Sequence, residues 1–303
     1  MMDRSTVPDR TDSASASAHR AVGPAHEGWY LDAVAAAAAA ERAAGVTIKV
    51  LRDADQMHRA VTVLDAIWQV DASTTVIEAN TLVALAHAGN YVAAALAGEE
   101  MIGVCAGFFH RPDEQALHSH IAGVLPQRAG KGVGKAIKLH QRAWAMAAGI
   151  TTITWTFDPL VARNAFLNLH RLGATVSDYL VDFYGPMTDI INTGQQTDRM
   201  LVSWDLAGRP AGSEGDLPGG PLVLAIAPGG GPSPGAGPNG SPGRCRIAIP
   251  TDIESLRRRD PATAASWRVA LRDTLQPLLN GGWTITDFDR SGHYWLANPK
   301  ERA

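Results

Sequence analysis

The sequence predicts an α/β fold of the α+β kind, in which a mixed but mostly antiparallel sheet is flanked by helices and followed by a C-terminal α+β extension. Three observations lead to this prediction. Apolar runs at 91–97, 101–109 and 117–125 are separated by short turns, which is typical of an antiparallel meander. A glycine-rich turn follows, and from Val133 the apolar residues have helical spacing. Beyond Gly185, short apolar runs alternate with loops rich in glycine and proline.

Length and composition describe an ordinary globular chain. It has 303 residues, 46% of them hydrophobic and 19% charged, and a net charge of −3, so no basic field favours nucleic acid. No apolar run approaches the ~18 residues of a membrane span, and the first residues lack the apolar segment of a signal peptide. We therefore expect a cytoplasmic protein without a membrane partner. Arginine outnumbers lysine and alanine is abundant, which is typical of a GC-rich bacterial genome.

Three regions are expected along the chain. Residues 1–28 have no hydrophobic period and predict a disordered tail. Residues 29–190 contain the meander, the glycine turn and the helix, and they form the main domain. Residues 191–303 form an α+β subdomain, in which the Gly- and Pro-rich segment 228–243 predicts a mobile loop. Two cysteines, Cys105 and Cys245, are far apart and are expected to be either buried core thiols or reactive thiols.

The remaining elements follow from periodicity and from turn residues. The alanine-rich segment 29–44 predicts a helix that packs against small side chains. Threonine alternates with larger apolar residues at 151–157, as in a half-buried strand. The other predicted elements are a strand at 47–51, a helix capped by Asp53 or Asp55, a helix from Asp158-Pro159 to Gly173, strands at 174–184, 201–206, 222–227 and 246–249, a helix from Asp260-Pro261 to Gly281, and a hairpin of 283–288 with 293–297.

The glycine turn is the strongest chemical signal. Gly130, Gly132 and Gly134 alternate with other residues, and Lys131 and Lys135 lie among them. Glycines at the start of a helix let a ligand approach the backbone, where free N–H groups and the positive end of the dipole face it. The turn therefore predicts a phosphate site. It is no P-loop, because Lys135 is not followed by Ser or Thr, and the preceding meander does not fit a dinucleotide-binding βαβ unit.

This order of three antiparallel strands, glycine turn, helix, strand, helix and strand resembles the GNAT acyltransferase fold. GNAT enzymes carry Gln/Arg-x-x-Gly-x-Gly/Ala at this turn and bind the pyrophosphate of acyl-CoA on its amides. Two placements of the motif are open in this sequence. In one, Gln127 leads and Gly130 and Gly132 are the glycines. In the other, Gly132 and Gly134 are the glycines, and Ala129 stands where Gln or Arg is expected.

The resemblance extends over roughly residues 29–296. The segments SHIAGVLPQRAGKGVG, ITWTFDPLVARNAFLNLHRLGA, VDFYGPM, TDRMLVSW and IPTDIESL together resemble one bacterial branch of predicted GNAT acetyltransferases. Members of that branch are often encoded beside N-acylamino acid racemases, and some are taken to be amino acid N-succinyltransferases. The resemblance implies transfer of an acyl group from acetyl-CoA or succinyl-CoA, as cosubstrate, to the amine of a small molecule, with an amino acid as the expected acceptor.

The resemblance also implies which residues bind CoA. The edge of the third meander strand would bind pantetheine through its main chain, the glycine turn would bind the pyrophosphate, and Asn164 would contact the pantetheine arm. The implied residues are Ala122, Gly123, Val124, Leu125, Gly130, Lys131, Gly132, Val133, Gly134, Lys135 and Asn164. No metal is expected, because the ten histidines show no ligand spacing beyond His118-x-His120.

Candidate catalytic residues lie on two predicted strands. His118 and His120 are two apart and share a strand face, so either could deprotonate the amine, with His120 preferred; a satisfied or solvent-facing histidine is the alternative. Tyr184 could donate to the thiolate sulfur, or be a core aromatic residue. The usual GNAT tyrosine lies in the helix before Gly173, where this chain has Leu169-His170.

Candidate acceptor-binding residues are Arg163, Asp182 and Arg199. The two arginines could grip a carboxylate bidentately, although Arg199 could pair with Asp198 instead. Asp182 shares a predicted strand face with Tyr184. A homodimer is left open. The sequence thus supports two functions: an N-acyltransferase acting by direct transfer, and an acyl-CoA-binding sensor or regulatory module that has lost catalysis.

Overall fold

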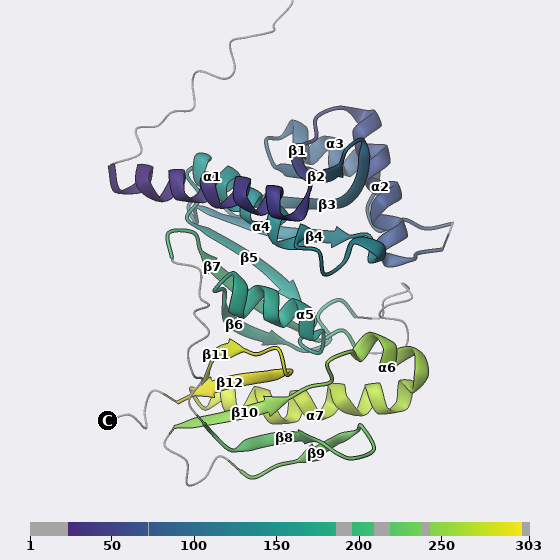
Figure 1. The fold of residues 1–303 in the computed structure, drawn as a ribbon, viewed down its shortest axis with the longest axis vertical. Helices are drawn as coiled ribbons and strands as arrows, with labels where there is room; N and C mark the ends of the chain where they lie inside the picture. Colours follow the sequence, from purple (N-terminus) through teal and green to yellow (C-terminus); the bar gives the residue numbers. More distant parts are fainter. Residues whose placement is uncertain (1–23, 72, 186–195, 209–218, 238–242, 299–303) are drawn as a thin grey trace, which may run out of the picture.

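The computed structural model describes residues 24–71, 73–185, 196–208, 219–237 and 243–298, which form two sheets (Figure 1). The first sheet has the strand order β1-β2-β3-β4-β5-β7-β6, and the second has the order β11-β12-β10-β8-β9. The strands are β1 Thr47–Val50, β2 Tyr91–Ala97, β3 Glu100–Phe109, β4 Ala116–Val124, β5 Thr152–Phe157, β6 Thr175–Leu180, β7 Arg199–Asp205, β8 Leu222–Ile226, β9 Pro232–Pro234, β10 Arg244–Ala248, β11 Thr284–Phe288 and β12 His293–Ala297.

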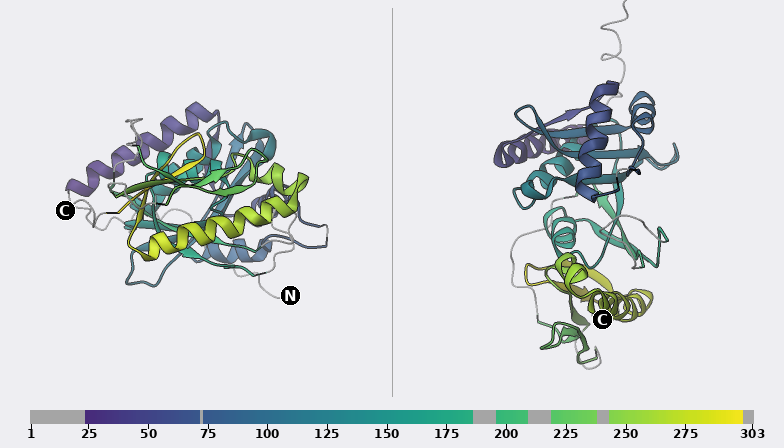
Figure 2. Two further views of the ribbon diagram at one scale, coloured as in Figure 1. Left: turned by 90° about the horizontal axis from the view of Figure 1, so that it is seen from below. Right: turned by 90° about the vertical axis from the view of Figure 1, so that its right-hand side faces the viewer.

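Helices cover both faces of the first sheet (Figures 1 and 2). The helices are α1 Pro24–Ala44, α2 Ala54–Trp68, α3 Ala79–His87, the 3₁₀ turn η1 Pro126–Arg128, α4 Val133–Ala147, α5 Ala162–Ala165 with the π-helical turn η2 Phe166–Arg171, α6 Ile253–Arg259 and α7 Pro261–Asn280. Met57, Ala60 and Leu64 are three and four apart in α2 and are buried together against one face. On the other face α4 packs on the strands, and α1 lies along α4.

The first sheet has the predicted mixed arrangement. Only β4 and β5 are parallel, and every other neighbouring pair in this sheet is antiparallel. The meander β2-β3-β4 leads through the glycine turn into α4, as the sequence predicts. The predicted fold class, a mixed and mostly antiparallel sheet flanked by helices with a C-terminal α+β extension, is confirmed.

The second sheet forms the C-terminal part. β8 and β10 are parallel, and the hairpin β11–β12 pairs antiparallel with β10. α7 packs against β8 and β9. Part of the predicted mobile loop 228–243 is a strand, because β9 pairs with β8, and Trp267 of α7 donates its indole N–H to the Gly230 carbonyl oxygen at 2.9 Å.

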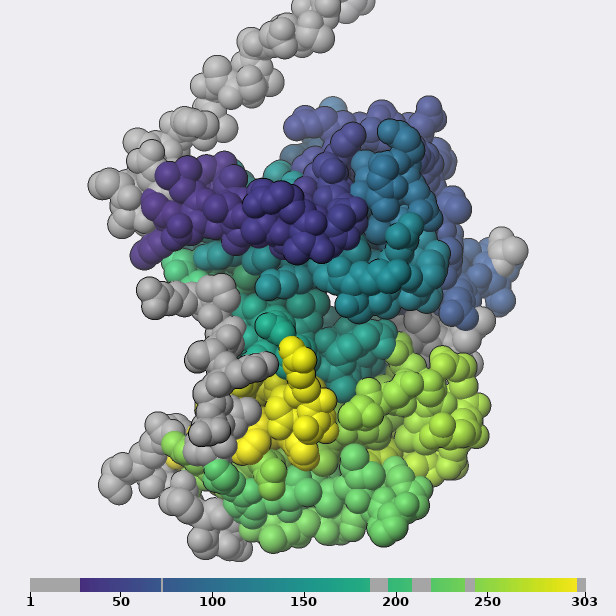
Figure 3. Space-filling model, viewed as in Figure 1, coloured from purple at the N-terminus to yellow at the C-terminus, as the bar shows by residue number. Residues whose placement is uncertain are grey.

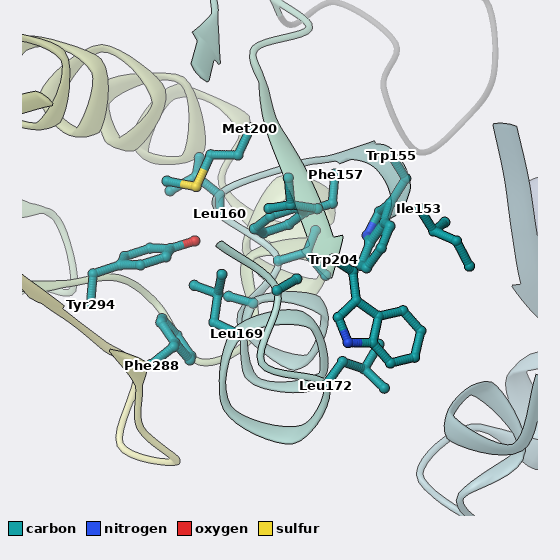
Figure 4. Close-up of a cluster of buried hydrophobic side chains, with 14 of the residues drawn as sticks. Ile153, Trp155, Phe157, Leu160, Leu169, Leu172, Met200, Trp204, Phe288 and Tyr294 are labelled. Atoms are coloured by element: carbon teal, nitrogen blue, oxygen red, sulfur yellow. The ribbon is translucent and has the colours of Figure 1, made fainter. Parts of the chain in front are cut away.

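One hydrophobic core joins the two sheets. Figure 4 shows Phe288 and Tyr294 of the second sheet beside Leu160 and Leu169 of the first part. The buried Tyr294 hydroxyl also donates to the Pro159 carbonyl oxygen at 2.6 Å. In the space-filling view the green and yellow C-terminal part packs directly on the teal segment around η2 (Figure 3). The extension is therefore docked on the turn that follows β5.

Several boundaries differ from the sequence prediction. α1 begins at Pro24, within the predicted tail, whose residues 1–23 lie outside the described residues. β7 lies beyond the predicted domain boundary at 190 but is inserted between β5 and β6, so the first sheet extends to Asp205. β6 ends at Leu180, four residues before the expected end. The helix expected at Asp158-Pro159 begins at Ala162. α3 and α6 were not predicted.

Both cysteines are core thiols. Cys105 and Cys245 are free and fully buried, and burial raises the pKa of each thiol. Of the two alternatives that the sequence left open, the structure supports the unreactive one. Among the described helices, none is long and apolar enough to cross a bilayer.

Candidate active site

β4 and β5 separate after a short parallel contact. Their register ends at His118 opposite Thr154, beyond which β4 pairs with β3 alone. A bulge lies at this point, because Ser119 and His120 together oppose the single Gly107 of β3. A Cβ on Gly107 would lie 2.7 Å from the His118 carbonyl oxygen, so the bulge requires glycine there. The two strands form an open fork, with the bulge at its closed end.

The open edge of β4 offers main-chain groups to a ligand. Leu125 N–H donates to the Ile102 carbonyl oxygen at 2.9 Å, which sets the alternation of the β3–β4 ladder. By that alternation Gly123 bonds toward β3, while Ala122 and Val124 direct their N–H and C=O groups into the fork. Of the four residues predicted to bind pantetheine, Ala122 and Val124 have main-chain groups available.

The glycine turn presents a row of free amides beside the fork. α4 begins at Val133, and its cap Gly132 has a φ of 84°, a conformation that favours glycine. Within the described residues no acceptor takes the backbone N–H groups of 130–135; the first bond of the helix runs from Ala136 to Gly132. The turn is exposed, so these amides can receive an anion. This helix start matches the second motif placement, with Ala129 in the leading position.

The helix after β5 passes next to this turn. Leu167 Cδ2 lies 3.7 Å from the point where a Cβ on Gly134 would be. Asn164 is half-buried at the start of the same helix, where its backbone N–H donates to the Val161 carbonyl oxygen at 2.9 Å. A pantetheine contact by the Asn164 side chain remains a prediction.

His118 is the end of a chain of hydrogen bonds. Glu114 Oε2 is 2.7 Å from His110 Nδ1, His110 Nε2 is 2.9 Å from Thr154 Oγ1, and Thr154 Oγ1 is 3.1 Å from His118 Nδ1. A carboxylate only accepts, so His110 Nδ1 donates to Glu114. In the tautomer in which the Thr154 hydroxyl donates to His110 Nε2, the Thr154 oxygen accepts from His118 Nδ1. This direction leaves His118 Nε2 with a free lone pair.

The second histidine lies on the same face of the sheet. The ring centroids of His118 and His120 are 6.3 Å apart. The centroid of the Phe108 ring is 5.2 Å from that of His118 and 5.6 Å from that of His120. Burial, with the charges of His120, His110 and Lys138, lowers the pKa of His118 to about 4, so His118 is neutral at pH 7. Burial also lowers the pKa of His120. A shallow surface hollow beside this network is lined by Phe108, Phe109, His110, Arg111, Glu114 and His118.

Tyr184 lies further along the same face. Its hydroxyl is 3.1 Å from Thr156 Oγ1, and Thr156 is two residues from Thr154 on β5. The Arg199 guanidinium lies 5.3 Å above the Tyr184 ring. Tyr184 is 41% exposed, so the core-aromatic alternative is wrong. The face thus carries a row of polar groups from His118 to Arg199.

The predicted acceptor-binding residues have other partners. Asp182 lies in a turn with a φ of 45°, and its carboxylate accepts from Thr197 N–H at 2.9 Å, so the expected strand face shared with Tyr184 is wrong. Arg163 pairs with Glu254 of α6 at 2.8 Å. Arg199 donates to the Asp198 carbonyl oxygen at 3.0 Å, so Asp198 is its neighbour, though not through the carboxylate.

A buried ion cluster that the sequence did not predict joins the two parts. Arg268 donates to both carboxylate oxygens of Asp158 at 2.8 Å, and Arg257 donates to one of them at 2.6 Å. All three side chains are buried. Within the described residues Arg257 Nε and Nη1 have no partner, and Arg199 contributes further positive charge near Asp158. Asp158 was expected to cap a helix; it accepts from Leu160 N–H at 2.9 Å, but the helix starts later.

The position of the usual GNAT tyrosine serves the contact between the two parts. Leu169 is buried in the shared core (Figure 4). His170 Nδ1 is 3.1 Å from Asp287 of β11, and its ring stacks on Phe166. This position therefore offers no tyrosine hydroxyl as a proton donor.

Sequence reasoning missed four residues of this region: Glu114, His110, Thr154 and Lys138. Thr154 carried a signal, because the threonines of β5 alternate with buried residues and so share one exposed face. The others gave none, because Glu114 and His110 join the site through the bond of His110 with Thr154, 44 positions away, and Lys138 joins it through Ser119, 19 positions away. Among the described residues no group of three His, Cys, Asp or Glu side chains could hold a metal ion.

Comparisons with known proteins find similarity in fold only. No family model matches the chain, and no curated protein matches it. Solved structures that resemble it include an N-acetyltransferase from Staphylococcus aureus Mu50, at 12% identity and a TM-score of 0.45, over 53% of this chain and 98% of that one. The ribosomal-protein-S18-alanine N-acetyltransferase from Escherichia coli shares 15% identity, with a TM-score of 0.42, over 57% and 97%.

A GNAT superfamily phosphinothricin acetyltransferase from Sinorhizobium meliloti, solved in complex with AcCoA, shares 16% identity, with a TM-score of 0.45, over 57% of this chain and 96% of that one. About half of this chain is therefore compared with nearly all of each neighbour. The assignment of the fold depends on the antiparallel meander, the glycine turn and the helix that follows it, which are the features of the GNAT fold that the sequence predicts.

Proposed function

We propose that this chain is an acyl-CoA-dependent N-acyltransferase that moves an acyl group from a CoA thioester to the amine of a small molecule. One observation carries the proposal: the fork between β4 and β5 opens beside the free amides of 130–135. An open strand edge can hold the amide groups of pantetheine by main-chain bonds, and helix-start amides can hold a pyrophosphate. Both halves of a CoA molecule thus have a complementary surface on adjacent elements.

The transfer step can be assigned to groups at the closed end of the fork. The amine nitrogen attacks the thioester carbonyl carbon, the C–S bond breaks, and sulfur keeps the electron pair. The bulge in β4 supplies main-chain groups where the carbonyl oxygen would gain charge. The amine must lose a proton, for which His118 Nε2 has a free lone pair and His120 is the second candidate.

For the acceptor and the acyl group, we propose an amino acid and either acetyl or succinyl. The support is the positive charge at the far end of the polar row, where Arg199 lies beyond Tyr184 and close to the arginines around Asp158. A carboxylate is the complementary ligand for guanidinium groups. The α-carboxylate of an amino acid and the free carboxylate of a succinyl group are both ligands of this kind.

Thiol release from acetyl-CoA and succinyl-CoA, measured against a panel of amino acids and simple amines, tests the function. We expect turnover with at least one pair, and equilibrium binding of CoA itself. CoA binding without turnover across the panel would favour the alternative function, an acyl-CoA-binding sensor. The support for that alternative is that Leu169-His170 replace the usual helix tyrosine and that His170 bonds to Asp287. Absence of CoA binding would contradict both.

Replacing the catalytic histidine is expected to lower kcat by about 100-fold or more, because a positioned base contributes that much to proton transfer. His118→Ala and His120→Ala are compared at saturating acyl-CoA and acceptor. If His118 is the base, wild-type kcat stays level as the pH falls from 8 to 5 and declines near pH 4, since the base form persists above a pKa of about 4. If His120 is the base, the decline starts at higher pH, though below the usual histidine value of about 6.5.

The matched control is His87→Ala, since His87 is an exposed histidine on α3, away from the fork. It should leave kcat and its pH profile unchanged. Thr154→Val tests the hydrogen-bonded chain, because it removes the link from His110 while leaving both imidazoles in place. If neither histidine variant changes kcat, the assignment of the base is wrong.

A further inference from the structure

Lys138 of α4 lies at the closed end of the fork. Its Nζ is 2.7 Å from Ser119 Oγ on β4 and 4.0 Å from the centre of the Trp155 ring on β5. Ser119 and Trp155 are the first residues of the two strands beyond the last β4–β5 pair, His118 with Thr154. The ammonium therefore bridges the fork at the point where the strands part.

This cation is buried without a counter-ion. Lys138 is 5% exposed, and no carboxylate of the described residues forms an ion pair with it. Its other neighbours are Gln141 Oε1 at 3.4 Å and Cys105, which contacts both Gln141 and Ser119. An ammonium has three donors, and the structure gives it two acceptors and an aromatic face. Burying a charge without a counter-ion costs free energy, so we expect an anion to bind beside Lys138.

The titratable groups around Lys138 do not supply that anion. Cys105 of β3 is fully buried, and burial raises the pKa of its thiol. His118 of β4 has its pKa lowered, in part by the charge of Lys138. Burial lowers the pKa of Lys138 to about 8, which leaves it mostly charged at pH 7. A ligand that brings a negative charge into the fork can therefore pair with the Lys138 ammonium.

We propose that Lys138 stabilises the CoA thiolate as the acyl group leaves. When the amine nitrogen bonds to the carbonyl carbon and the C–S bond breaks, the electron pair stays on sulfur, and the Lys138 ammonium donates a hydrogen bond to it. The amine proton leaves separately, to the base on the other face of the sheet. In the GNAT fold that the chain resembles, this role belongs to a tyrosine of the helix before Gly173. This chain has Leu169-His170 at that tyrosine position, and Lys138 takes over its role.

This inference depends on the proposed function, because it requires CoA in the fork. The alternative is that Lys138 is only a structural residue, satisfied by Ser119 and Gln141. The two differ in how binding depends on the thiol. A structural lysine is indifferent to the sulfur, whereas a thiolate-stabilising lysine lowers the pKa of the bound thiol and so favours CoA over desulfo-CoA as the pH rises.

The experiment measures the affinities of CoA and desulfo-CoA by calorimetry between pH 6 and 8, for the wild type, Lys138→Met and Lys138→Arg. In the wild type we expect the ratio of the two affinities to rise about threefold over this range, because a neighbouring cation that lowers the thiol pKa by about one unit, from a usual value of about 8.5, gives this factor. In Lys138→Met the ratio should stay flat, and Lys138→Arg should keep part of the rise. Lys49→Met, on the exposed side of β1, is the control and should behave as the wild type.

Each outcome has a distinct meaning. If the wild type binds both ligands with a ratio that does not change with pH, or if Lys138→Met keeps the rise, the role of Lys138 is overturned while the CoA site stands. If neither ligand binds, the proposed function itself fails. Replacement of a buried charge by an apolar side chain is often tolerated, so Lys138→Met should fold, and a melting curve checks this. If Lys138→Met does not fold, the pH dependence of the affinity ratio in the wild type and in Lys138→Arg still tests the role of Lys138.

Discussion

Asp158→Asn is expected to destabilise the folded chain by about 3–5 kcal/mol, the usual cost of leaving a buried charge without its partner. Arg268 and Arg257 both donate to this carboxylate, and their side chains are only 3% and 9% exposed. The neutral amide would leave two buried guanidinium groups uncompensated, at the place where α6 and α7 meet the end of β5. Urea unfolding at pH 7, followed by circular dichroism, measures the loss.

The matched control is Asp273→Asn, an exposed aspartate on the same helix as Arg268. We expect it to change the free energy of unfolding by no more than about 0.5 kcal/mol, as is usual for a surface substitution. A loss of similar size in both variants would mean that the Asp158 cluster has no special role. A loss below about 1 kcal/mol in Asp158→Asn would contradict the prediction directly.

The same carboxylate gives a pH dependence with a definite sign. Burial alone would raise the pKa of Asp158, but the charges of Arg268 and Arg257 hold it well below its usual range. Its contribution is therefore complete above the unfolded value of about 3.9 and is lost as the pH falls below it. Wild-type stability should decline more steeply below pH 4 than that of Asp158→Asn, which lacks this titration.

The elements that could be predicted from the sequence are those with local signals. The meander, the helix from Val133 and the cap Asp53 follow from periodicity and turn residues, and the structure has all of them. α3 begins after Glu78 without a side-chain cap bond, so its start carries no such signal. The insertion of β7 between β5 and β6 depends on pairing between distant segments, which no local pattern reveals.

Side-chain partners were predicted less well than main-chain sites, for a physical reason. The amides of the glycine turn belong to consecutive residues, so their arrangement follows from the helix start. The bonds of His110 with Thr154 and of Asp158 with Arg268 join residues 44 and 110 positions apart. Tyr184 fits the alternation of a strand, but the strand ends earlier, because Asp182 takes a left-handed conformation and bonds to Thr197.

Gly132→Val is expected to lower CoA affinity by about 100-fold or more. Gly132 caps α4 at a φ of 84°, which a β-branched residue adopts only with strain. A Cβ there would meet Ala44 only at 3.7 Å, so the backbone conformation, and not lack of space, is the obstacle. A changed conformation would turn the amides of 133–135 away from a shared anion. Losing two hydrogen bonds to a charged group, at about 1.5–3 kcal/mol each, gives this factor.

Gly149→Val separates the loss of binding from the strain itself. Gly149 lies at the other end of α4 with a φ of 77° and open space around it, so valine there suffers the same backbone penalty far from the turn. Both variants should lose similar stability, and only Gly132→Val should lose CoA affinity. Pantetheine, which lacks the pyrophosphate, should bind the wild type and Gly132→Val alike, because it depends on the strand edge. If Gly132→Val binds CoA as the wild type does, the pyrophosphate does not lie on this turn.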